Sequence, residues 1–349
     1  MRLINQNKSV SIVAIVYDLL AATRGTAPIT GGTVFKKFPM ADLSPLTIYQ
    51  KSGTIFSQLA NPAPADMPVG ICYSAAWSPN SEFMAVAHTN SPYIIIYQRS
   101  GTIFTKLANP AALPAGTGNG IAWSPDGEFL AVAHTTTPFI TIYQRSVTTF
   151  TKLADPAALP AGNGGSVAWS PNGEFLAVAH DVSPFITIYQ VSGITFTKLA
   201  DPVALPAGAG KGVAWSPDGL FLAISHATTP FLTIYQRSVT TFTKLADPAT
   251  LPAGTGNGIA WSPDGEFLAV AHTTTPFITI YQRSGTIFTK SANPGTLPAG
   301  NAWNAVWSPN GELLAVAHDV SPFMTIYQTD KILPVKGRVQ TIGTIKEGY

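Results

Sequence analysis

Histidine is the residue best suited to bind a metal or to exchange a proton near neutral pH, and this chain repeats it at a constant spacing of 46 residues. Two copies, His180 and His318, precede an aspartate that could add a carboxylate ligand. Adjacent strand side chains point to opposite faces, however, and equivalent positions of different repeats lie too far apart for one tetrahedral zinc. We therefore expect turn-capping or backbone-bonding histidines and no metal site. The six are His88, His134, His180, His226, His272 and His318.

Six tryptophans follow the same period, and their rings could stack on a ligand. A residue that holds the same place in every repeat usually meets a need of every repeat. We therefore expect these rings to pack between repeats. They are Trp77, Trp123, Trp169, Trp215, Trp261 and Trp307.

Catalytic signatures are missing from the sequence. There is no G-x-S-x-G motif, no phosphate-binding loop and no pair of catalytic carboxylates, and the one cysteine, Cys72, has no partner pattern. We expect no catalytic residue, no cofactor-binding residue and no cofactor. The net charge of +2 offers no field for nucleic acid. The apolar run from Val10 to Ala22 is interrupted by Asp18 and is too short to span a bilayer, so we expect no membrane insertion.

The elements that hold these residues can be read from one repeat, Gly120 to Ala154. A short apolar strand, "IAWS", meets the turn "PDG", and the strand "EFLAVAH" follows. The turn "TTTP" separates it from the strands "FITIYQRS" and "TTFTKLA", and a Pro- and Gly-rich linker ends the unit. The middle strands are apolar at nearly every position, which indicates that both sheet faces are covered. Radially packed four-stranded sheets meet that requirement.

The stretch "AWSPDGEFLAVAH…ITIYQ" resembles the WD-repeat propellers and the bacterial TolB-type propellers, which share a W-S-P-D-G turn. The resemblance covers residues 44–328 in six full copies. The Trp-Asp pair that closes a WD repeat is Tyr-Gln here, so the buried hydrogen-bond set of that family is not carried over. The repeat is also similar, more weakly, to repeat proteins of bacteriophage particles.

We predict an all-β, seven-bladed β-propeller of four-stranded antiparallel blades with a 46-residue repeat, covering residues 8–330. An earlier "IYQ" at residues 48–50 motivates a degenerate first blade over residues 25–60. We expect the N-terminal strand 11–18 to latch the last blade, with Arg338–Gly348 as the alternative outer strand. The strand-like tail, residues 331–349, contacts either another chain or its own last blade.

The predicted ring has two unlike faces. One carries the "SPDG" turns, and adjacent strand ends there place Glu128 beside Arg145. The other carries the "DPAALPAG" linkers and the "HTTTP" turns, is nearly uncharged and is our candidate interaction face, because binding residues tend to lie on loops of a rigid scaffold. The candidates are Asp155, Leu159, Thr135, Thr136, His134, His180, Asp181, His272, His318 and Asp319.

These features predict a non-enzymatic binding or structural module in a larger assembly. The low content of charged residues, 11%, and the near-identical repeats favour a bacteriophage virion protein of the tail or surface. A periplasmic or extracellular TolB-like scaffold of a bacterium is the alternative. The expected partners are other protein chains of the assembly and a host-surface protein or glycan.

Overall fold

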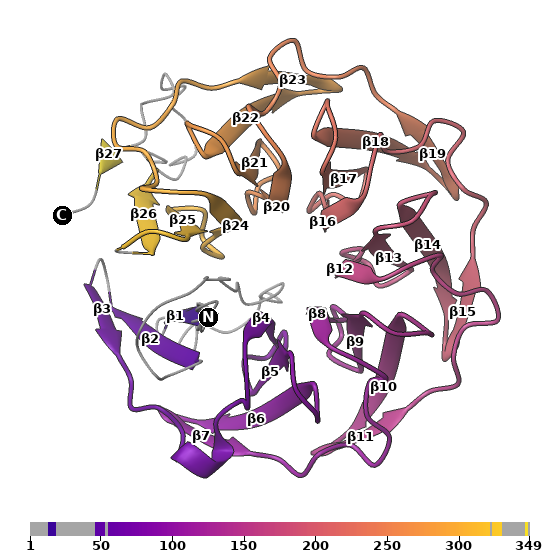
Figure 1. Cartoon of the computed structure of the whole chain (residues 1–349), viewed down its shortest axis with the longest axis vertical. Coiled ribbons are helices and arrows are strands. Elements are labelled where there is room, and N and C mark those ends of the chain that lie inside the picture. The colour runs from indigo at the N-terminus through magenta and orange to yellow at the C-terminus, as the bar shows by residue number, and fades with distance from the viewer. Residues whose placement is uncertain (1–12, 19–45, 53–54, 322, 330–345, 348–349) are drawn as a thin grey trace, which may run out of the picture.

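A computed structural model describes residues 13–18, 46–52, 55–321, 323–329 and 346–347 of the 349-residue chain. Its sheets stand around a central axis like the blades of a wheel (Figure 1). The first and last sheets of the chain lie next to each other in this ring (Figure 1).

Six of the sheets are four-stranded blades whose strands follow the order of the chain. The first contains β4 (Cys72–Trp77), β5 (Phe83–His88), β6 (Ile94–Ser100) and β7 (Ile103–Lys106), and the second contains β8 (Gly118–Trp123), β9 (Phe129–His134), β10 (Ile140–Ser146) and β11 (Thr149–Lys152). The third contains β12 (Gly164–Trp169), β13 (Phe175–His180), β14 (Ile186–Ser192) and β15 (Thr195–Lys198). The fourth contains β16 (Gly210–Trp215), β17 (Phe221–His226), β18 (Leu232–Ser238) and β19 (Thr241–Lys244). The fifth contains β20 (Gly256–Trp261), β21 (Phe267–His272), β22 (Ile278–Ser284) and β23 (Ile287–Lys290), and the sixth contains β24 (Ala302–Trp307), β25 (Leu313–His318), β26 (Met324–Gln328) and β27 (Lys346–Glu347).

A further sheet has three strands, β1 (Val13–Asp18), β2 (Leu46–Ser52) and β3 (Ile55–Gln58). A single turn of 3-10 helix, η2 (Pro64–Asp66), lies in the connection to the first blade. In each blade the first strand is nearest the axis and the fourth is on the rim (Figure 1). We call them the inner, second, third and outer strands.

Local chemistry explains the turn between the inner and second strands. In the second blade the hydroxyl of Ser124 accepts a hydrogen bond from the backbone N–H of Phe129 at 2.8 Å and donates to the carboxylate of Asp126. That carboxylate also accepts the N–H of Glu128 at 2.9 Å. Gly127 follows with φ of +71°, a conformation that costs glycine little. The Ser-Pro-Asp-Gly sequence therefore forms these hydrogen bonds of the turn within its own blade.

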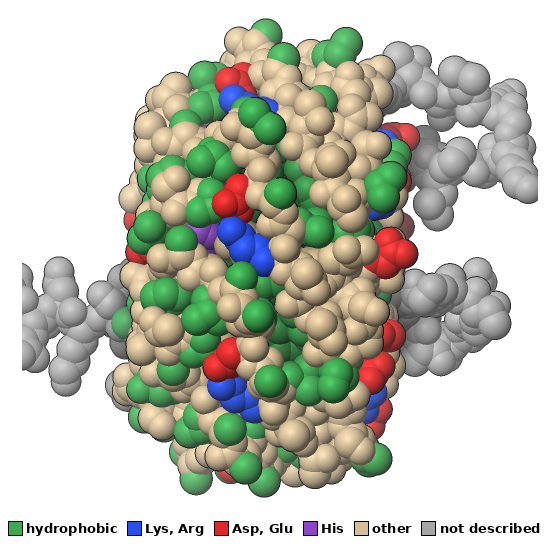
Figure 2. Space-filling model, turned by 90° about the vertical axis from the view of Figure 1, so that its right-hand side faces the viewer, with side chains coloured by type: hydrophobic (Ala, Val, Ile, Leu, Met, Phe, Trp, Pro, Cys, Tyr) green, Lys and Arg blue, Asp and Glu red, His purple; other side chains and the backbone are tan. Residues whose placement is uncertain are grey.

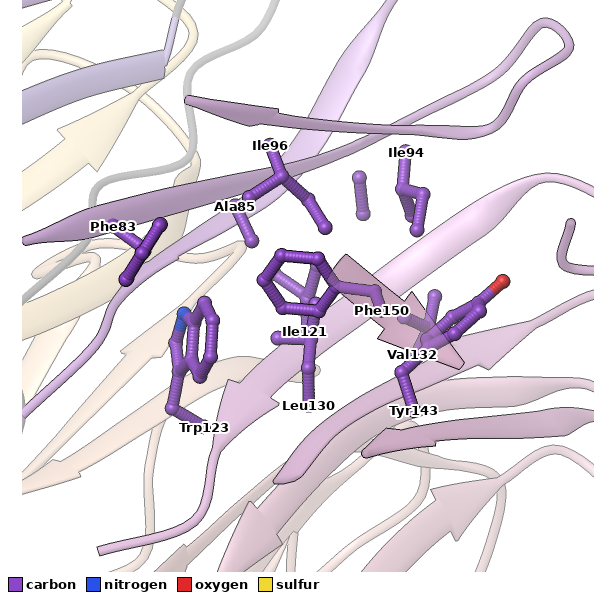
Figure 3. Close-up of a cluster of buried hydrophobic side chains, with 11 residues drawn as sticks. Phe83, Ala85, Ile94, Ile96, Ile121, Trp123, Leu130, Val132, Tyr143 and Phe150 are labelled. Carbon is purple, nitrogen blue, oxygen red and sulfur yellow. The ribbon is translucent and has the colours of Figure 1, made fainter. Parts of the chain in front are cut away.

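The core lies between the blades, as the continuous apolar strands predicted. Phe83 and Ile96 of the first blade face Ile121, Leu130 and Tyr143 of the second across one cluster (Figure 3). The opposite face of the second blade packs on the third in the same way. Each second strand is thus covered on both sides, which explains why its residues are almost all fully buried.

The tryptophans are part of these inter-blade clusters, as predicted. All six are only 2–8% exposed. Trp123 packs against Phe83 of the preceding blade, with tilted rings whose centroids are 6.1 Å apart, and its Nε1 donates to the carbonyl of Ala76 at 3.2 Å. The ring therefore joins two blades by packing and by a hydrogen bond.

The predicted count of seven four-stranded blades is wrong, because the described residues form six four-stranded sheets and one three-stranded sheet. The residues of β2 and β3 match the third and outer strands of the repeat, "IYQ" and "IF", but no "FLAVAH" segment precedes them. Their sheet is completed by β1, which runs parallel to β2 with Val13 opposite Leu46. The expected degraded strands of the degenerate first blade, at residues 25–41, lie outside the described residues.

The predicted latch is also corrected by the strand pairing. The strand expected at 11–18 pairs with β2 and not with the last blade. The outer strand of the last blade is β27, with Glu347 opposite Tyr327. The physical reason is that β2 has a free edge where other blades carry a second strand, and the β-branched N-terminal segment fills it. The pairing of β27 follows the alternative in which the C-terminal segment provides this strand.

Candidate functional site

Strand direction places the turns on two faces of the ring. Each inner strand ends at a Ser-Pro turn on one face of the ring. The second strand runs back to the other face, where a turn such as "TTTP" leads into the third strand. The turns between second and third strands and the linkers between blades therefore share one face, which we call the linker face. The turns are joined to the linkers: the N–H of Thr135 donates to the carbonyl of Thr117 at 3.2 Å.

The linker face is tied to the core by a buried tyrosine in each blade. The hydroxyl of Tyr143 donates to the carbonyl of Ala112 at 2.8 Å, and the ring itself is fully buried. Burial raises the pKa of this phenol far above its usual range, so it stays a donor. The same bond recurs from Tyr97, Tyr189, Tyr235, Tyr281 and Tyr327 to the linker that precedes each blade. The linkers are therefore fixed in position and present a preformed surface.

The six histidines are fully buried between blades, although four of them were candidates for the interaction face. The Nε2 of His134 lies 3.0 Å from the hydroxyl of Thr141, and four later blades repeat this pair. In the first blade Ile95 replaces the threonine, and neither ring nitrogen of His88 has a hydrogen-bond partner. Burial lowers the pKa of His134 to about 4, so its imidazole is neutral at physiological pH. His134, His180, His272 and His318 therefore belong to the packing and not to the surface.

The other six candidates lie on or near the linker face, five of them in or between the second and third blades and Asp319 in the sixth. Thr136 and Asp181 are exposed in turns, whereas Thr135, Leu159 and Asp319 are half-buried. Asp155 forms an ion pair with Lys152 at 2.9 Å near the rim. The carboxylates of Asp181 and Asp319 accept hydrogen bonds from Asn163 and Asn301. The structure thus places most of these residues on two neighbouring blades and leaves Asp319 apart from them.

Charged side chains are distributed unevenly over the surface. An edge-on view shows acidic side chains along one of the two faces and close groups of basic and acidic side chains on the rim (Figure 2). On the Ser-Pro face, Glu128 accepts a hydrogen bond from Gln144 at 2.8 Å. Its expected neighbour, Arg145, donates to the carbonyl of Gly127 at 2.8 Å and lies over the ring of Phe83 at 5.2 Å. Arg145 therefore serves inter-blade packing more than ion pairing, whereas Arg283 also pairs with Asp218 of the preceding blade at 2.8 Å.

Neither a metal cluster nor a membrane span is found in the described parts of the chain. No group of three or more His, Cys, Asp or Glu side chains is placed there to share a metal ion. No helix among the described residues is long and apolar enough to cross a bilayer.

A central cavity of about 660 Å³, which the sequence analysis did not predict, runs along the axis between the inner strands. Toward the Ser-Pro face its wall is formed by the Trp-Ser-Pro segments of the blades. Toward the linker face the lining residues differ from blade to blade. There the second positions of three consecutive inner strands hold Lys211, Asn257 and Trp303.

This second position of the inner strand varies more than any position of the second strand. The six blades have Tyr73, Asn119, Gly165, Lys211, Asn257 and Trp303 there. The amide of Asn119 donates to the carbonyl of Gly164 in the next blade at 2.9 Å, and Asn257 donates to Ala302 at the same distance. A position-by-position comparison of the repeats would have singled out this level of the cavity from the sequence alone.

Comparison with known proteins identifies the fold. No protein-family model and no curated protein matches the chain. Among solved structures, a putative 6-phosphogluconolactonase from Bacteroides uniformis has a TM-score of 0.60 at 14% identity, with 76% of this chain and 81% of that chain covered. Hydrazine synthase from Kuenenia stuttgartiensis has a TM-score of 0.59 at 16% identity, covering 74% and 76% of the two chains. A chain of a mitotic checkpoint complex has a TM-score of 0.58 at 16% identity, covering 84% and 83%. At these identities the likeness shows the fold alone: the chain is a β-propeller with four-stranded antiparallel blades.

Proposed function

We propose that this β-propeller is a non-enzymatic binding module that contacts a protein or glycan partner through its linker face. One observation carries the proposal. The same hydrogen bond from a tyrosine hydroxyl to a linker carbonyl holds each linker in place, while the exposed side chains on that face differ between blades. Val182 and Val320 are about half exposed in two turns, at 49% and 46%, where other blades carry threonine or asparagine. A rigid surface with unequal side chains suits recognition of one partner.

Paired lysine substitutions test the use of the linker face. Val182→Lys with Val320→Lys adds charge to the linker face, and Val147→Lys with Val239→Lys adds the same charge to turns on the opposite side. We expect a partner that is captured by the wild-type chain to be captured by the second variant and lost by the first. Equal capture by both variants, or loss only with the second, would contradict the proposal. Thermal unfolding of both variants checks that each remains folded.

The setting that we propose for this module is the tail or surface of a bacteriophage particle. Its support is the low content of charged residues, 11%, and the near-identity of the repeats, and the alternative is a periplasmic or cell-surface scaffold. Purified particles should contain the chain, as an antibody against it would detect. Detection in the periplasm of uninfected cells, with none in particles, would reject the virion assignment and favour the scaffold.

A further inference from the structure

The wall of the central cavity carries one charged side chain that the packing of the blades does not require. The six inner strands contain one charged side chain among them, Lys211 on β16. No aspartate or glutamate is among the described residues that line the cavity. Lys211 is exposed and lies in the wall of this cavity. Its ammonium therefore faces a space in which the described lining supplies no opposite charge.

Three other lysines of the repeat behave differently. Lys152, Lys198 and Lys244 lie on outer strands, and each pairs with the aspartate three residues later at 2.9–3.0 Å. These pairs stabilise exposed rim positions to a small extent. No equivalent partner for Lys211 exists within the described chain, so its position is not accounted for by local pairing.

The two neighbouring inner strands add complementary groups at the same level. Asn257 on β20 and Trp303 on β24 occupy the strand position that Lys211 occupies on β16. The hydrogen bond from Asn257 to the carbonyl of Ala302, 2.9 Å long, fixes the orientation of the carboxamide. A ligand at this level meets a positive charge, a pre-positioned amide and an aromatic ring on three successive strands.

We infer that the central cavity binds a carboxylated sugar. The ammonium of Lys211 would hold the carboxylate, the amide of Asn257 would bond hydroxyl groups, and the ring of Trp303 would cover the apolar face of the sugar. The cavity volume of about 660 Å³ lies within the range of small-molecule sites, roughly 300–1,000 Å³. A single lysine suits one negative charge, whereas phosphate sites usually combine arginines or several N–H donors.

This site is separate from the proposed partner surface, so the two can fail independently. The linker-face variant with Val182→Lys and Val320→Lys should bind the sugar as the wild type does. A sugar that binds while no partner is captured would leave the cavity site intact and remove the proposed function.

Titration calorimetry with glucuronate, glucose and acetate tests the inference. The full chain should bind glucuronate at least about tenfold more tightly than glucose, which lacks the carboxylate, or acetate, which lacks the ring. Lys211→Met keeps the length of the side chain, removes its charge, and should weaken glucuronate binding by about tenfold or more. Lys244→Met is the matched control on an outer strand and should leave binding unchanged. Trp303→Leu should weaken binding of both sugars.

Three results would overturn the inference. They are undetectable binding of glucuronate, equal binding of glucose, and unchanged affinity in folded Lys211→Met protein, with folding checked by thermal unfolding. A glucuronate-terminated oligosaccharide distinguishes the two sources of such a sugar. Tighter binding of the oligosaccharide identifies the end of a polymer as the ligand, and equal binding identifies the free acid.

Discussion

The second strands and the beginnings of the inner strands obey different constraints, although both belong to the same repeat. Three of the six second strands read FLAVAH, and two more, β5 and β25, differ from it by one residue that remains apolar. At the second position of the inner strand, five residue types occur in six blades. Second-strand side chains touch neighbouring blades on both faces and tolerate little change in volume. The inner-strand position borders the cavity in three blades, at Lys211, Asn257 and Trp303, so packing there leaves the residue type open to selection for another purpose.

Acidification should have the largest effect on stability, because it acts on the buried histidines of five second strands at once. Burial lowers the pKa values of His88, His134 and His272 to about 4 and also lowers those of His180 and His226. Unfolded histidine titrates near about 6.5, so between these values the unfolded chain binds more protons than the folded one. The free energy of unfolding should therefore be constant between about pH 7.5 and 6.5 and fall steadily from there to about pH 4.

Denaturant midpoints measured between about pH 7.5 and 4 check this expectation. The Asp218 carboxyl also has a lowered pKa, through its bonds to Ser216, Leu220 and Arg283, but its contribution is lost only below its ordinary value of 3.8. Lys211→Met leaves the second strands untouched and should show the wild-type pH profile. A flat profile in this window would mean that the histidines are not held neutral by the blades.

A pair of alanine substitutions compares the two regions directly. Leu176→Ala removes a fully buried side chain from a second strand and should lower the free energy of unfolding by about 2–5 kcal/mol. Asn257→Ala removes one hydrogen bond at the cavity wall and should cost about 0.5–1.5 kcal/mol. Denaturant unfolding of both proteins measures the difference. Equal losses would show that the inner-strand position is under the same packing constraint and would weaken the contrast.

The smallest effect is expected at the turn between the third and outer strands, where some blades carry valine and others glycine. Val147 has φ of +56° and is 77% exposed, whereas the equivalent Gly101, Gly193 and Gly285 have φ of 56–61°. A β-branched residue is strained in this conformation. Val147→Gly should raise the free energy of unfolding by up to about 1 kcal/mol, since relief of strain outweighs the added freedom of the unfolded chain.

A valine without positive φ provides the control for this turn. Val203 is also fully exposed and has ordinary backbone geometry. Val203→Gly should lower the free energy of unfolding by about 0.5–1 kcal/mol, because glycine gains entropy only in the unfolded state. Thermal melting points of the two variants should therefore move in opposite directions. Shifts in the same direction would show that Val147 is not strained.

Much of the blade could be predicted because its determinants are local. The Ser124 and Asp126 turn, the continuous apolar second strand and the repeated Trp123 position each indicate their structure within a few residues. The histidines were expected at turns, and four of them on the interaction face, so their burial between blades was missed. Their partner, such as Thr141 seven residues later, lies across a turn whose conformation the repeat alone does not reveal.

The candidate site was predicted only in part. The linker face follows from strand direction, and its exposed residues Thr136 and Asp181 lie where they were expected. The cavity wall was missed because Lys211 and Trp303, two repeats apart, differ in type, and only an alignment of the repeats shows that they share one strand position. Ring closure brings these positions to one level.

The sequence by itself determined the repeat, the four strands of a blade and the turns that join them, because those depend on neighbouring residues and on a period that can be counted. The tertiary structure alone decided that six blades have four strands, that β1 completes the sheet of β2, and that β27 completes the last blade. These pairings use backbone hydrogen bonds, which any sequence can form. Which edge remains free, and which segment can reach it, is set only when the whole ring is assembled.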